Sequence, residues 1–360
     1  MNRTTLPLLA VTMGDACGIG PEIIARACGA LLPAPCVVVG SVDAMRRAVR
    51  ACALDLPVLR LDAPEAARAA PRHSVPVWEP PGLPTGLAAL PMGSVQADAG
   101  RAAIACIEAA ADLALQRRAS AVVTAPVHKQ ALAAAGSPFP GHTEMLQALV
   151  HRAGQMPGVR ANSALPEVRM MLANDELRVV LVTIHVSLKR AIEMLSTDGI
   201  ATTIRLAHEA GRRFGLAAPR VAVAGLNPHA SEGGLFGDEE SRLIEPAIAR
   251  ARAQGIDARG PFAPDTVFMR ARHASGHPGE FDLVVAMTHD QGLIPVKYLG
   301  VERGVNVTLG LPIVRTSPDH GTAFDIAGRG VADPASLQAA LSMACELVAH
   351  ELDRGLGGGR

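Results

Sequence analysis

The sequence predicts an α/β fold in two domains, each with a mostly parallel sheet covered by helices. Short apolar runs alternate with longer alanine-rich segments along most of the chain, and this alternation is typical of β-α-β units. At 360 residues the chain is also longer than one hydrophobic core usually requires. We find no internal repeat in the sequence.

Six apolar runs have the length and composition of buried strands. The run 220–226 is typical, because it is rich in valine and alanine and stops at Asn227 and Pro228, which favour turns. The six predicted strands are 6–13, 36–40, 120–126, 177–185, 220–226 and 282–289.

Four alanine-rich segments predict helices. The first has Pro21 in its opening turn, where proline is well tolerated. The predicted helices are 21–32, 99–118, 198–215 and 334–355, and the predicted surface loops are 79–94, 152–166 and 271–280.

The composition argues against nucleic acid and membrane partners. Lys plus Arg equals Asp plus Glu at 34 each, and the chain has one Trp and one Tyr, so basic and base-stacking surfaces are not expected. No apolar stretch approaches the roughly 20 residues that span a bilayer, and the first residues lack a signal-peptide pattern. The six cysteines form no CxxC pair, which favours reduced thiols in a cytoplasmic protein.

Three predicted strands lead into a histidine: His185, His229 and His289. In open α/β sheets, ligands bind beyond the carboxyl ends of the strands, so these imidazoles can converge on one point. Three imidazoles with an open position are typical of a catalytic zinc site; cobalt or iron would also suit them, and magnesium less well. The alternative is three unrelated histidines that cap loops.

A second set of residues favours an anion. His142 and Thr143 open a predicted helix, and backbone N–H groups at a helix start suit an anion, although an ordinary helix cap would look the same. Lys297, Asn306 and Arg315 follow in an apolar stretch, where lysine and arginine can bind phosphate or can simply be surface charges.

The segment 13–24 is a glycine-rich turn between a strand and a helix. It contains neither GxGxxG nor GxxxxGK[ST], so it supports neither a dinucleotide fingerprint nor a P-loop. A generic tight turn would explain its glycines, whereas Asp15 and Glu22 favour a loop that faces a site.

Taken together, these motifs resemble the 4-hydroxythreonine-4-phosphate dehydrogenase (PdxA) family of vitamin B6 biosynthesis. The resemblance implies the fold of the isocitrate and isopropylmalate dehydrogenases, with two α/β/α domains and an active-site crevice between them. We expect residues 1–130 plus 320–360 on the cofactor side, and residues 131–319 on the side of metal, substrate and dimerisation. The matching stretches, in family order, are 12–23, 124–129, 140–144, 226–234, 263–268, 289–300 and 304–330.

The resemblance also implies roles for individual residues. Metal ligands would be His185, His229 and His289, with zinc expected first and cobalt or magnesium as alternatives. Lys297 would be the first candidate for the catalytic base and Asp290, acting through water, the second, while Asp265 lies in a motif that faces the family's active site. The implied substrate contacts are His142, Thr143, Lys297, Asn306 and Arg315.

The segment 320–334 resembles the adenosine-binding loop of isopropylmalate and isocitrate dehydrogenases, although a simple strand-loop-helix would also explain its glycines. A carboxylate at the place of Asp325 would accept hydrogen bonds from the adenosine ribose and repel a 2′-phosphate, so NAD is expected rather than NADP. The implied cofactor contacts are Gly14, Asp15, His320, Gly321, Thr322, Asp325 and Asp333.

The expected activity is metal- and NAD-dependent oxidation, with decarboxylation, of 4-phosphohydroxy-L-threonine to 3-amino-2-oxopropyl phosphate. Similar enzymes act on 4-phosphorylated threonate or erythronate or on cis-dihydrodiol carboxylates, and a non-catalytic binding protein is a remote alternative. Ala16 and Cys17 depart mildly from the family's usual "DPAGIGPE". The resemblance further implies a homodimer with a shared active site, which the apolar loops 137–150 and 292–301 support.

Overall fold

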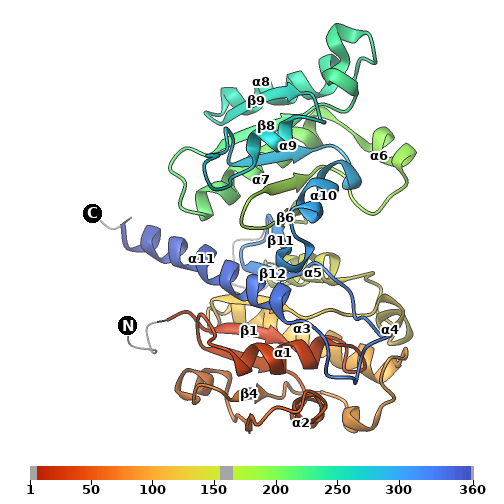
Figure 1. Cartoon of the computed structure of the whole chain (residues 1–360), viewed down its shortest axis with the longest axis vertical. Coiled ribbons are helices and arrows are strands. Elements are labelled where there is room, and N and C mark those ends of the chain that lie inside the picture. The colour runs from red at the N-terminus through yellow and green to blue at the C-terminus, as the bar shows by residue number, and fades with distance from the viewer. Residues whose placement is uncertain (1–5, 155–164, 358–360) are drawn as a thin grey trace. The chain divides into compact units, whose positions relative to one another are not determined.

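The computed structural model describes residues 6–154 and 165–357, and the chain divides into two compact units. Unit 1 comprises Met1–Pro166 and Leu311–Ala349, and unit 2 comprises Glu167–Gly310 and His350–Arg360. Both units combine strands with helices (Figure 1). The predicted α/β class is therefore confirmed.

The sheet of unit 1 is parallel throughout its described strands, in the order β3-β4-β2-β1-β5-β12. Its central strands are completely buried, as their apolar sequences predict. The strands are β1 (Leu9–Thr12), β2 (Cys36–Val39), β3 (Val58–Arg60), β4 (Val75–Trp78), β5 (Ala121–Thr124) and β12 (Val314–Pro318).

The helices of unit 1 begin where local chemistry favours a start. Pro21 lies in the first turn of α1, and the Ser41 hydroxyl accepts a hydrogen bond from the Ala44 N–H at the start of α2. The helices are α1 (Gly20–Gly29), α2 (Val42–Ala51), α3 (Ala97–Leu115), α4 (Lys129–Ala134), α5 (His142–Gly154) and α11 (Ala335–Gly357), with short turns η2 (Pro64–Ala69) and η3 (Leu87–Ala89).

The sheet of unit 2 is mixed, in the order β11-β6-β7-β10-β8-β9. The pairs β11·β6 and β6·β7 are antiparallel, whereas β7, β10, β8 and β9 run parallel to one another. The strands are β6 (Arg169–Ala173), β7 (Arg178–Leu181), β8 (Arg220–Ala224), β9 (Asp257–Phe262), β10 (Leu283–Ala286) and β11 (Val305–Leu309).

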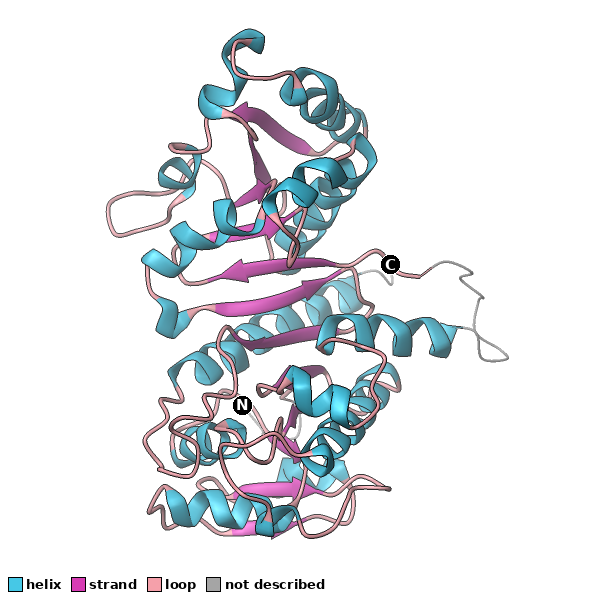
Figure 2. Ribbon diagram, turned by 90° about the vertical axis from the view of Figure 1, so that its right-hand side faces the viewer, coloured by secondary structure: helices cyan, strands magenta, loops and turns pink. Residues whose placement is uncertain are grey.

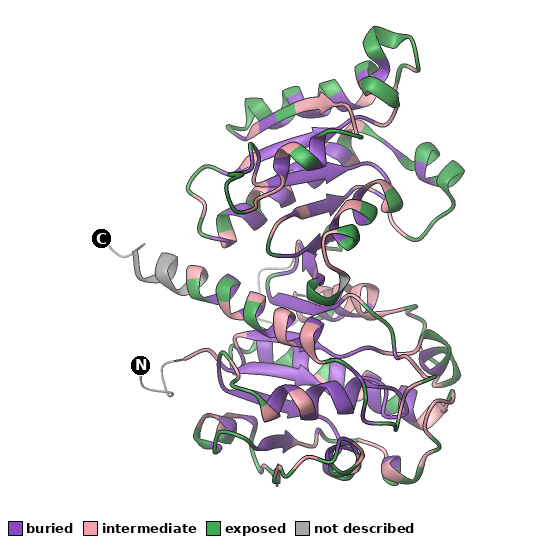
Figure 3. Cartoon of the chain, viewed as in Figure 1, coloured by how far each residue is buried: buried purple, intermediate pink, exposed green. Residues whose placement is uncertain are grey.

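Helices flank the strands of each unit on both sides (Figure 2), and the strands of each unit are largely buried (Figure 3). In unit 2 the core includes Phe281, Val284 and Leu181. The helices of unit 2 are α6 (Leu188–Met194), α7 (Thr197–Arg213), α8 (Glu245–Ala253), α9 (Val267–Ala271) and α10 (His289–Tyr298), with short turns η4 (Pro228–Gly234), η5 (Glu240–Ile244) and η6 (Val301–Arg303).

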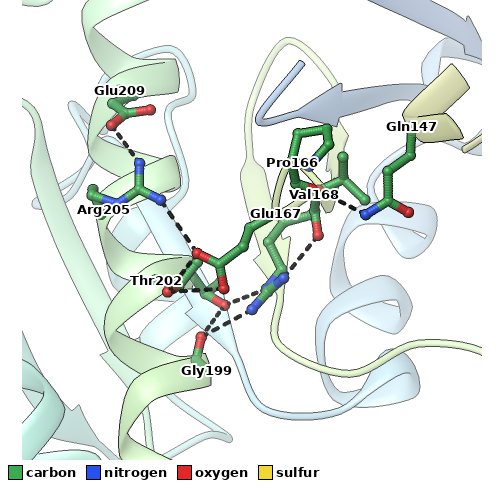
Figure 4. Close-up of polar contacts among 10 residues, drawn as sticks. Gln147, Pro166, Glu167, Val168, Gly199, Thr202, Arg205 and Glu209 are labelled. Carbon is green, nitrogen blue, oxygen red and sulfur yellow. Dashed lines mark hydrogen bonds and ion pairs between the residues drawn. The ribbon is translucent and has the colours of Figure 1, made fainter. Parts of the chain in front are cut away.

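Polar contacts hold the first residues of unit 2 against α7 (Figure 4). The Thr202 hydroxyl donates to Glu167 at 3.2 Å, and Arg205 lies between Glu167 at 3.7 Å and Glu209 at 2.7 Å. The returning chain passes the same point, because a Cβ on Gly310 would lie 1.9 Å from the Glu167 carbonyl oxygen. Only glycine fits there.

The domain boundaries differ from the expected ones. Residues 131–166 and 311–319, expected in the middle domain, group with unit 1. The physical reason is that α4 and α5 pack on α3, and that β12 pairs with β5.

The predicted loops are mostly irregular where the structure describes them, but 79–94 contains the short turn η3 and α5 extends to Gly154 at the start of 152–166. The stretch 271–280 contains one isolated bridge, between Ala274 and His277, whereas 155–164, most of the predicted loop 152–166, lies outside the described residues. Within the described ranges, no helix combines the length and apolar composition that crossing a bilayer requires.

Candidate functional site

The three candidate metal ligands follow three neighbouring parallel strands of unit 2. The strands ran shorter than predicted: β7 ends four residues before His185, β8 five before His229, and β10 three before His289, which opens α10. Because β10 lies between β7 and β8, the sequence order of the histidines is not their spatial order.

The structure brings two of these imidazoles together. The ring centroids of His185 and His289 are 5.5 Å apart with an interplanar angle of 46°, and both line a cavity of about 350 Å³ with Thr183 and Gln291. The His229 ring instead lies 6.1 Å from Phe236. Among the described residues, no three His, Cys, Asp or Glu side chains form a metal-binding group.

A network of hydrogen bonds fixes the backbone around the histidines. His229 has φ +53° and begins a left-handed run that continues through Gly233, a conformation that ordinary residues adopt only when held. Glu240, 2% exposed, accepts from the Leu226 N–H at 2.8 Å and the Asn227 N–H at 2.7 Å. Gln291 links the mouths of β10 and β8 by accepting from the Met287 N–H and donating to the Gly225 carbonyl, both at 2.7 Å.

The two imidazoles that the structure brings together have the chemistry that a divalent transition metal prefers. Two imidazoles face a shared cavity, and the third comes from the adjacent strand on a loop fixed by buried groups. His289 Nδ1 lies 2.7 Å from Asp290 Oδ1, the carboxylate–histidine contact that orients metal-binding imidazoles. Imidazole nitrogen is a preferred ligand of zinc and cobalt and a poor one for magnesium.

The other unit 2 candidates are not drawn into one cluster by any described contact. Asp265 is exposed in the loop between β9 and α9, and the Asp290 side chain is 83% exposed. Lys297 is exposed in the last turn of α10. Asn306 is half-buried on β11, opposite Leu172 of β6.

Unit 1 contains a buried cationic cluster formed by β12, β5 and α5. Arg315 is 3% exposed and donates to the Thr124 hydroxyl at 2.6 Å. Burial lowers the pKa of Arg315 to about 10, partly offset by Glu144, so the guanidinium still carries its charge at neutral pH.

His142, the first residue of α5, completes this cluster. Burial, helped by the charge of Arg315, holds the pKa of His142 well below its usual value, so the imidazole is neutral. Its buried Nε2 atom has no hydrogen-bond partner among the described residues. Thr143 follows in the same turn, half-buried. A buried cation, an unsatisfied imidazole nitrogen and a helix start together suit an anion.

The glycine-rich turn of unit 1 packs against the loop 320–334. The Ile19 N–H donates to the Thr322 carbonyl at 3.0 Å, and a Cβ on Gly18 would lie 2.9 Å from the Thr322 Cβ. Gly14 has φ +73°, and a Cβ there would lie 2.5 Å from the Pro126 carbonyl oxygen. The glycines therefore permit a close approach of three backbone segments.

Asp15 lies inside this arrangement. It is 1% exposed, its Oδ1 accepts from the Cys17 N–H at 2.8 Å, and its buried Oδ2 has no partner among the described residues. Burial raises the pKa of Asp15. Nearby, the His128 ring stacks on Phe324 of the loop 320–334, with centroids 4.5 Å apart.

The remaining cofactor candidates fall into two groups. His320, Gly321 and Asp325 are exposed, and a Cβ on Gly321 would meet no atom within 4 Å, so this side of the loop has room for a ligand. Asp333, in contrast, accepts from the Ala335 N–H at 2.9 Å, at the start of α11. This contact caps the start of α11, so Asp333 has a structural role there.

The sequence analysis missed several residues that hold the sites in place. The sequence predicts that Glu22 lies in a loop that faces a site, but both of its oxygens accept hydrogen bonds from glycine N–H groups of the loop 320–334. Glu240, Gln291 and the His128–Phe324 stack were not identified. The available signal for such residues was a polar side chain in a segment predicted to be buried. That signal does not identify the hydrogen-bond partner, which cannot be read from one sequence.

The family model and the similar proteins of known name indicate the same family. The model of the family described as pyridoxal phosphate biosynthetic protein PdxA matches residues 32–344. A 4-hydroxythreonine-4-phosphate dehydrogenase from Beijerinckia indica subsp. indica is 52% identical over 344 residues, which cover 94% of this chain and 94% of that protein. A D-threonate 4-phosphate dehydrogenase from Salmonella typhimurium is 43% identical over 342 residues, covering 94% and 98%.

A solved structure is also similar over nearly the whole chain. The crystal structure of 4-hydroxythreonine-4-phosphate dehydrogenase from Klebsiella pneumoniae superposes with a TM-score of 0.82 at 42% identity, covering 96% of this chain and 98% of that one.

Proposed function

The chain belongs to the PdxA family of dehydrogenases, and from this premise we propose that it oxidises a 4-phosphorylated hydroxy acid with NAD. The preferred substrate is 4-phosphohydroxy-L-threonine, and the product after loss of CO₂ is 3-amino-2-oxopropyl phosphate. The buried Arg315 carries the proposal of a phosphorylated substrate. A buried guanidinium that keeps its charge is well suited to bidentate pairing with a phosphate.

The substrate phosphate would be held by Arg315, His142 and Thr143. Because His142 is neutral, its Nε2 can donate or accept a hydrogen bond without adding charge. The N–H groups in the first turn of α5 add the partial positive charge of a helix start. Lys297 and Asn306 are proposed as further substrate contacts.

His185, His229 and His289 would hold the divalent metal, with zinc preferred over cobalt and magnesium. A metal there would supply Lewis-acid stabilisation of the alkoxide that develops on the substrate hydroxyl. Asp290 orients the His289 imidazole through the 2.7 Å contact with Nδ1, which leaves Nε2 for the metal.

The catalytic base must take one proton from the substrate hydroxyl. Lys297, on the same helix as His289, is the first candidate, and Asp290 acting through water is the second. Asp265 is proposed to line the same site. NAD would supply the acceptor for the hydride of the carbinol carbon, and the β-keto acid formed in this way would lose its carboxylate as CO₂.

NAD would lie against the glycine-rich turn and the loop 320–334 of unit 1. The residues fit such a ligand, because Gly321 and Asp325 face open space while the loop behind them is fixed by glycine contacts. Gly14, Asp15, His320 and Thr322 complete the proposed surface, with Asp333 holding its far end through the cap on α11.

Asp325 would set the preference for NAD, because its carboxylate suits ribose hydroxyls and repels a 2′-phosphate. Replacing Asp325 by lysine should raise the KM for NAD and lower the KM for NADP. Steady-state kinetics with both cofactors measure this. Unchanged kinetics with both would mean that the loop 320–334 does not bind adenosine.

A second candidate function is the same chemistry on D-threonate 4-phosphate, favoured by the 43% identity to an enzyme of that name. Erythronate 4-phosphate and cis-dihydrodiol carboxylates are further candidates. The test is NADH formation on this panel, with metal content measured on the same sample. The substrate with the highest kcat/KM identifies the function, and a metal-loaded protein that reduces NAD with none of them would overturn the proposal.

We further propose a cytoplasmic homodimer in which both chains contribute to each active site. The surface around the histidine cavity supports this, because α6 is largely exposed (Figure 3) and presents Leu188 at 64% and Met194 at 47% exposure. Ile294 and Tyr298 of α10 are also exposed. Light scattering at working concentration that gives a monomer would overturn the dimer. None of the six cysteines is in a disulfide, which supports a reducing compartment.

A further inference from the structure

Glu22 of α1 is one of the most deeply buried carboxylates described in unit 1, at 1% exposure. Its two oxygens accept separate hydrogen bonds, from the Gly328 N–H at 2.5 Å and from the Gly330 N–H at 2.7 Å. These glycines lie 306 and 308 residues further along the chain. One side chain therefore fastens the loop 320–334 to the helix that follows the glycine-rich turn.

The same helix makes a second contact with this loop. The Arg26 guanidinium, one turn after Glu22, donates to the Gly330 carbonyl. Both backbone polar groups of Gly330 are therefore bound by α1: Glu22 accepts from its N–H, and Arg26 donates to its C=O.

The backbone conformation of the loop allows these hydrogen bonds. Gly328 and Gly330 have φ values of +84° and +65°, and a Cβ on Gly330 would lie 2.1 Å from the Ala51 carbonyl oxygen. These values point the two N–H groups toward one carboxylate, at a closeness that a side chain would prevent. Glu22 is thus matched by two residues that could not be other than glycine without strain.

Both oxygens of Glu22 already accept hydrogen bonds from the loop, so its effect on catalysis must pass through the loop. Asp325 and Gly321 are exposed on the same loop, three to nine residues before the glycines that Glu22 holds. The Ile19 N–H, just before α1, also donates to the Thr322 carbonyl. The open edge of the loop is therefore bound to α1 at both of its ends.

We propose that Glu22 is a positioning residue for the nicotinamide cofactor, which fixes the adenosine-side loop through the Gly328 and Gly330 amides. This inference rests on the proposed assignment of the loop 320–334 to NAD. It predicts a selective effect, because the substrate candidates Arg315 and His142 lie on β12 and α5 and make no described contact with Glu22.

The test is Glu22→Gln in the full-length, metal-loaded enzyme. The carboxamide keeps the size of the side chain but offers one acceptor and one N–H₂ donor, so one glycine amide loses its partner and faces a donor. The matched control is Glu65→Gln in the same unit. Glu65 also accepts two hydrogen bonds, at 2.6 and 3.2 Å, but from the exposed Arg118, and exposed pairs contribute little.

Three measurements separate the outcomes. In Glu22→Gln, hydrogen exchange of the segment 320–334 should accelerate, the calorimetric Kd and the KM for NAD should rise about tenfold, and kcat and the KM for the hydroxy acid should stay within about twofold. Glu65→Gln should match the unmodified enzyme in all of them. An unchanged hydrogen-exchange rate of the segment 320–334 would show that Glu22 does not fix this loop. Faster exchange with an unchanged Kd for NAD would overturn the positioning role.

Failure of the proposed function has a different signature, because the unmodified enzyme would then bind no NAD in the calorimeter. If Glu22→Gln does not fold, Arg26→Gln tests the same loop from its other contact, at the Gly330 carbonyl. It should raise the Kd for NAD in the same direction by a smaller factor. An unchanged Kd in that variant would overturn the proposal.

Discussion

The candidate binding residues of the two units differ in how far the chain itself has fixed them. In unit 1, Arg315 and Asp15 are 3% and 1% exposed. In unit 2, the His289 and Asp290 side chains are 36% and 83% exposed, and His185 and His229 are also exposed. The candidate residues of unit 1 are therefore enclosed by the fold, whereas the histidines of unit 2 remain accessible from outside the unit.

Both units nevertheless hold a loop with a buried glutamate. Glu22 accepts two N–H groups from residues more than 300 positions away, while Glu240 accepts two from residues 13 and 14 positions away. We call each glutamate, together with the N–H groups that it binds, a clamp. The chemistry of the two clamps is the same, but the Glu22 clamp joins the two ends of the chain. The comparison predicts that disturbing each clamp impairs a different ligand.

The largest effect is expected for His289→Ala. The variant should stay folded, because an exposed residue at a strand mouth contributes little to the core, but it should lose bound metal and lower kcat/KM by more than about 100-fold. Metal analysis and kinetics on one sample check this, with similar losses for His185→Ala and His229→Ala. A fully active His229→Ala enzyme would leave only the His185–His289 pair to bind metal.

A smaller effect is expected for Glu240→Gln. The Leu226 and Asn227 N–H groups share one oxygen of Glu240, and the Asn227 side-chain N–H₂ donates to the other. A carboxamide can accept on only one of these two sides, so the left-handed run that carries His229 would loosen. We expect metal affinity to fall about tenfold with the Kd for NAD unchanged. Competition with a chelator gives the metal affinity. A loss of NAD affinity equal to that in Glu22→Gln would remove the distinction between the two clamps.

The smallest effect concerns the pH dependence of stability. The pKa of His142 is held well below 6.5 in the folded protein, so below pH 6.5 the unfolded chain binds a proton that the folded chain does not. The free energy of unfolding should therefore decrease as the pH falls through 6.5. Between pH 7.5 and 5.5, His142→Gln should lose about 1 kcal/mol less than the unmodified protein. Urea unfolding at the two pH values measures this, and equal losses would contradict it.

The fold was largely predictable because it depends on local patterns. The runs 36–40 and 220–226 became β2 and β8, and the helix 198–215 became α7. The strands β3, β4, β6, β9, β11 and β12 were not predicted. Of these, β3 and β9 are partly exposed and carry few consecutive apolar residues, whereas β12 is buried although it contains Arg315, Thr316 and Ser317. The boundaries at 166 and 310 depend on β12 pairing with β5, a contact nearly 200 residues apart in sequence.

The candidate site was predictable only at the level of residue type. Histidines after neighbouring strands indicated a site, and the structure brings His185 and His289 within 5.5 Å. Their order across the sheet, β7-β10-β8, could not be inferred, because it depends on strand crossovers. Glu22 and Glu240 were not identifiable as clamps, since a buried carboxylate is defined by partners that the sequence does not place beside it.

The crowding at Gly330 bears on directed evolution of cofactor use. A Cβ on Gly330 would meet the Ala51 carbonyl oxygen, and a Cβ on Gly93 would lie 2.5 Å from the Phe324 carbonyl oxygen. Most mutations at these two positions would therefore yield inactive clones. Gly321 has open space around it and Asp325 is exposed. A combinatorial library aimed at NADP should therefore randomise 321 and 325 and leave 93 and 330 as glycine, which concentrates the screened diversity where the backbone tolerates it.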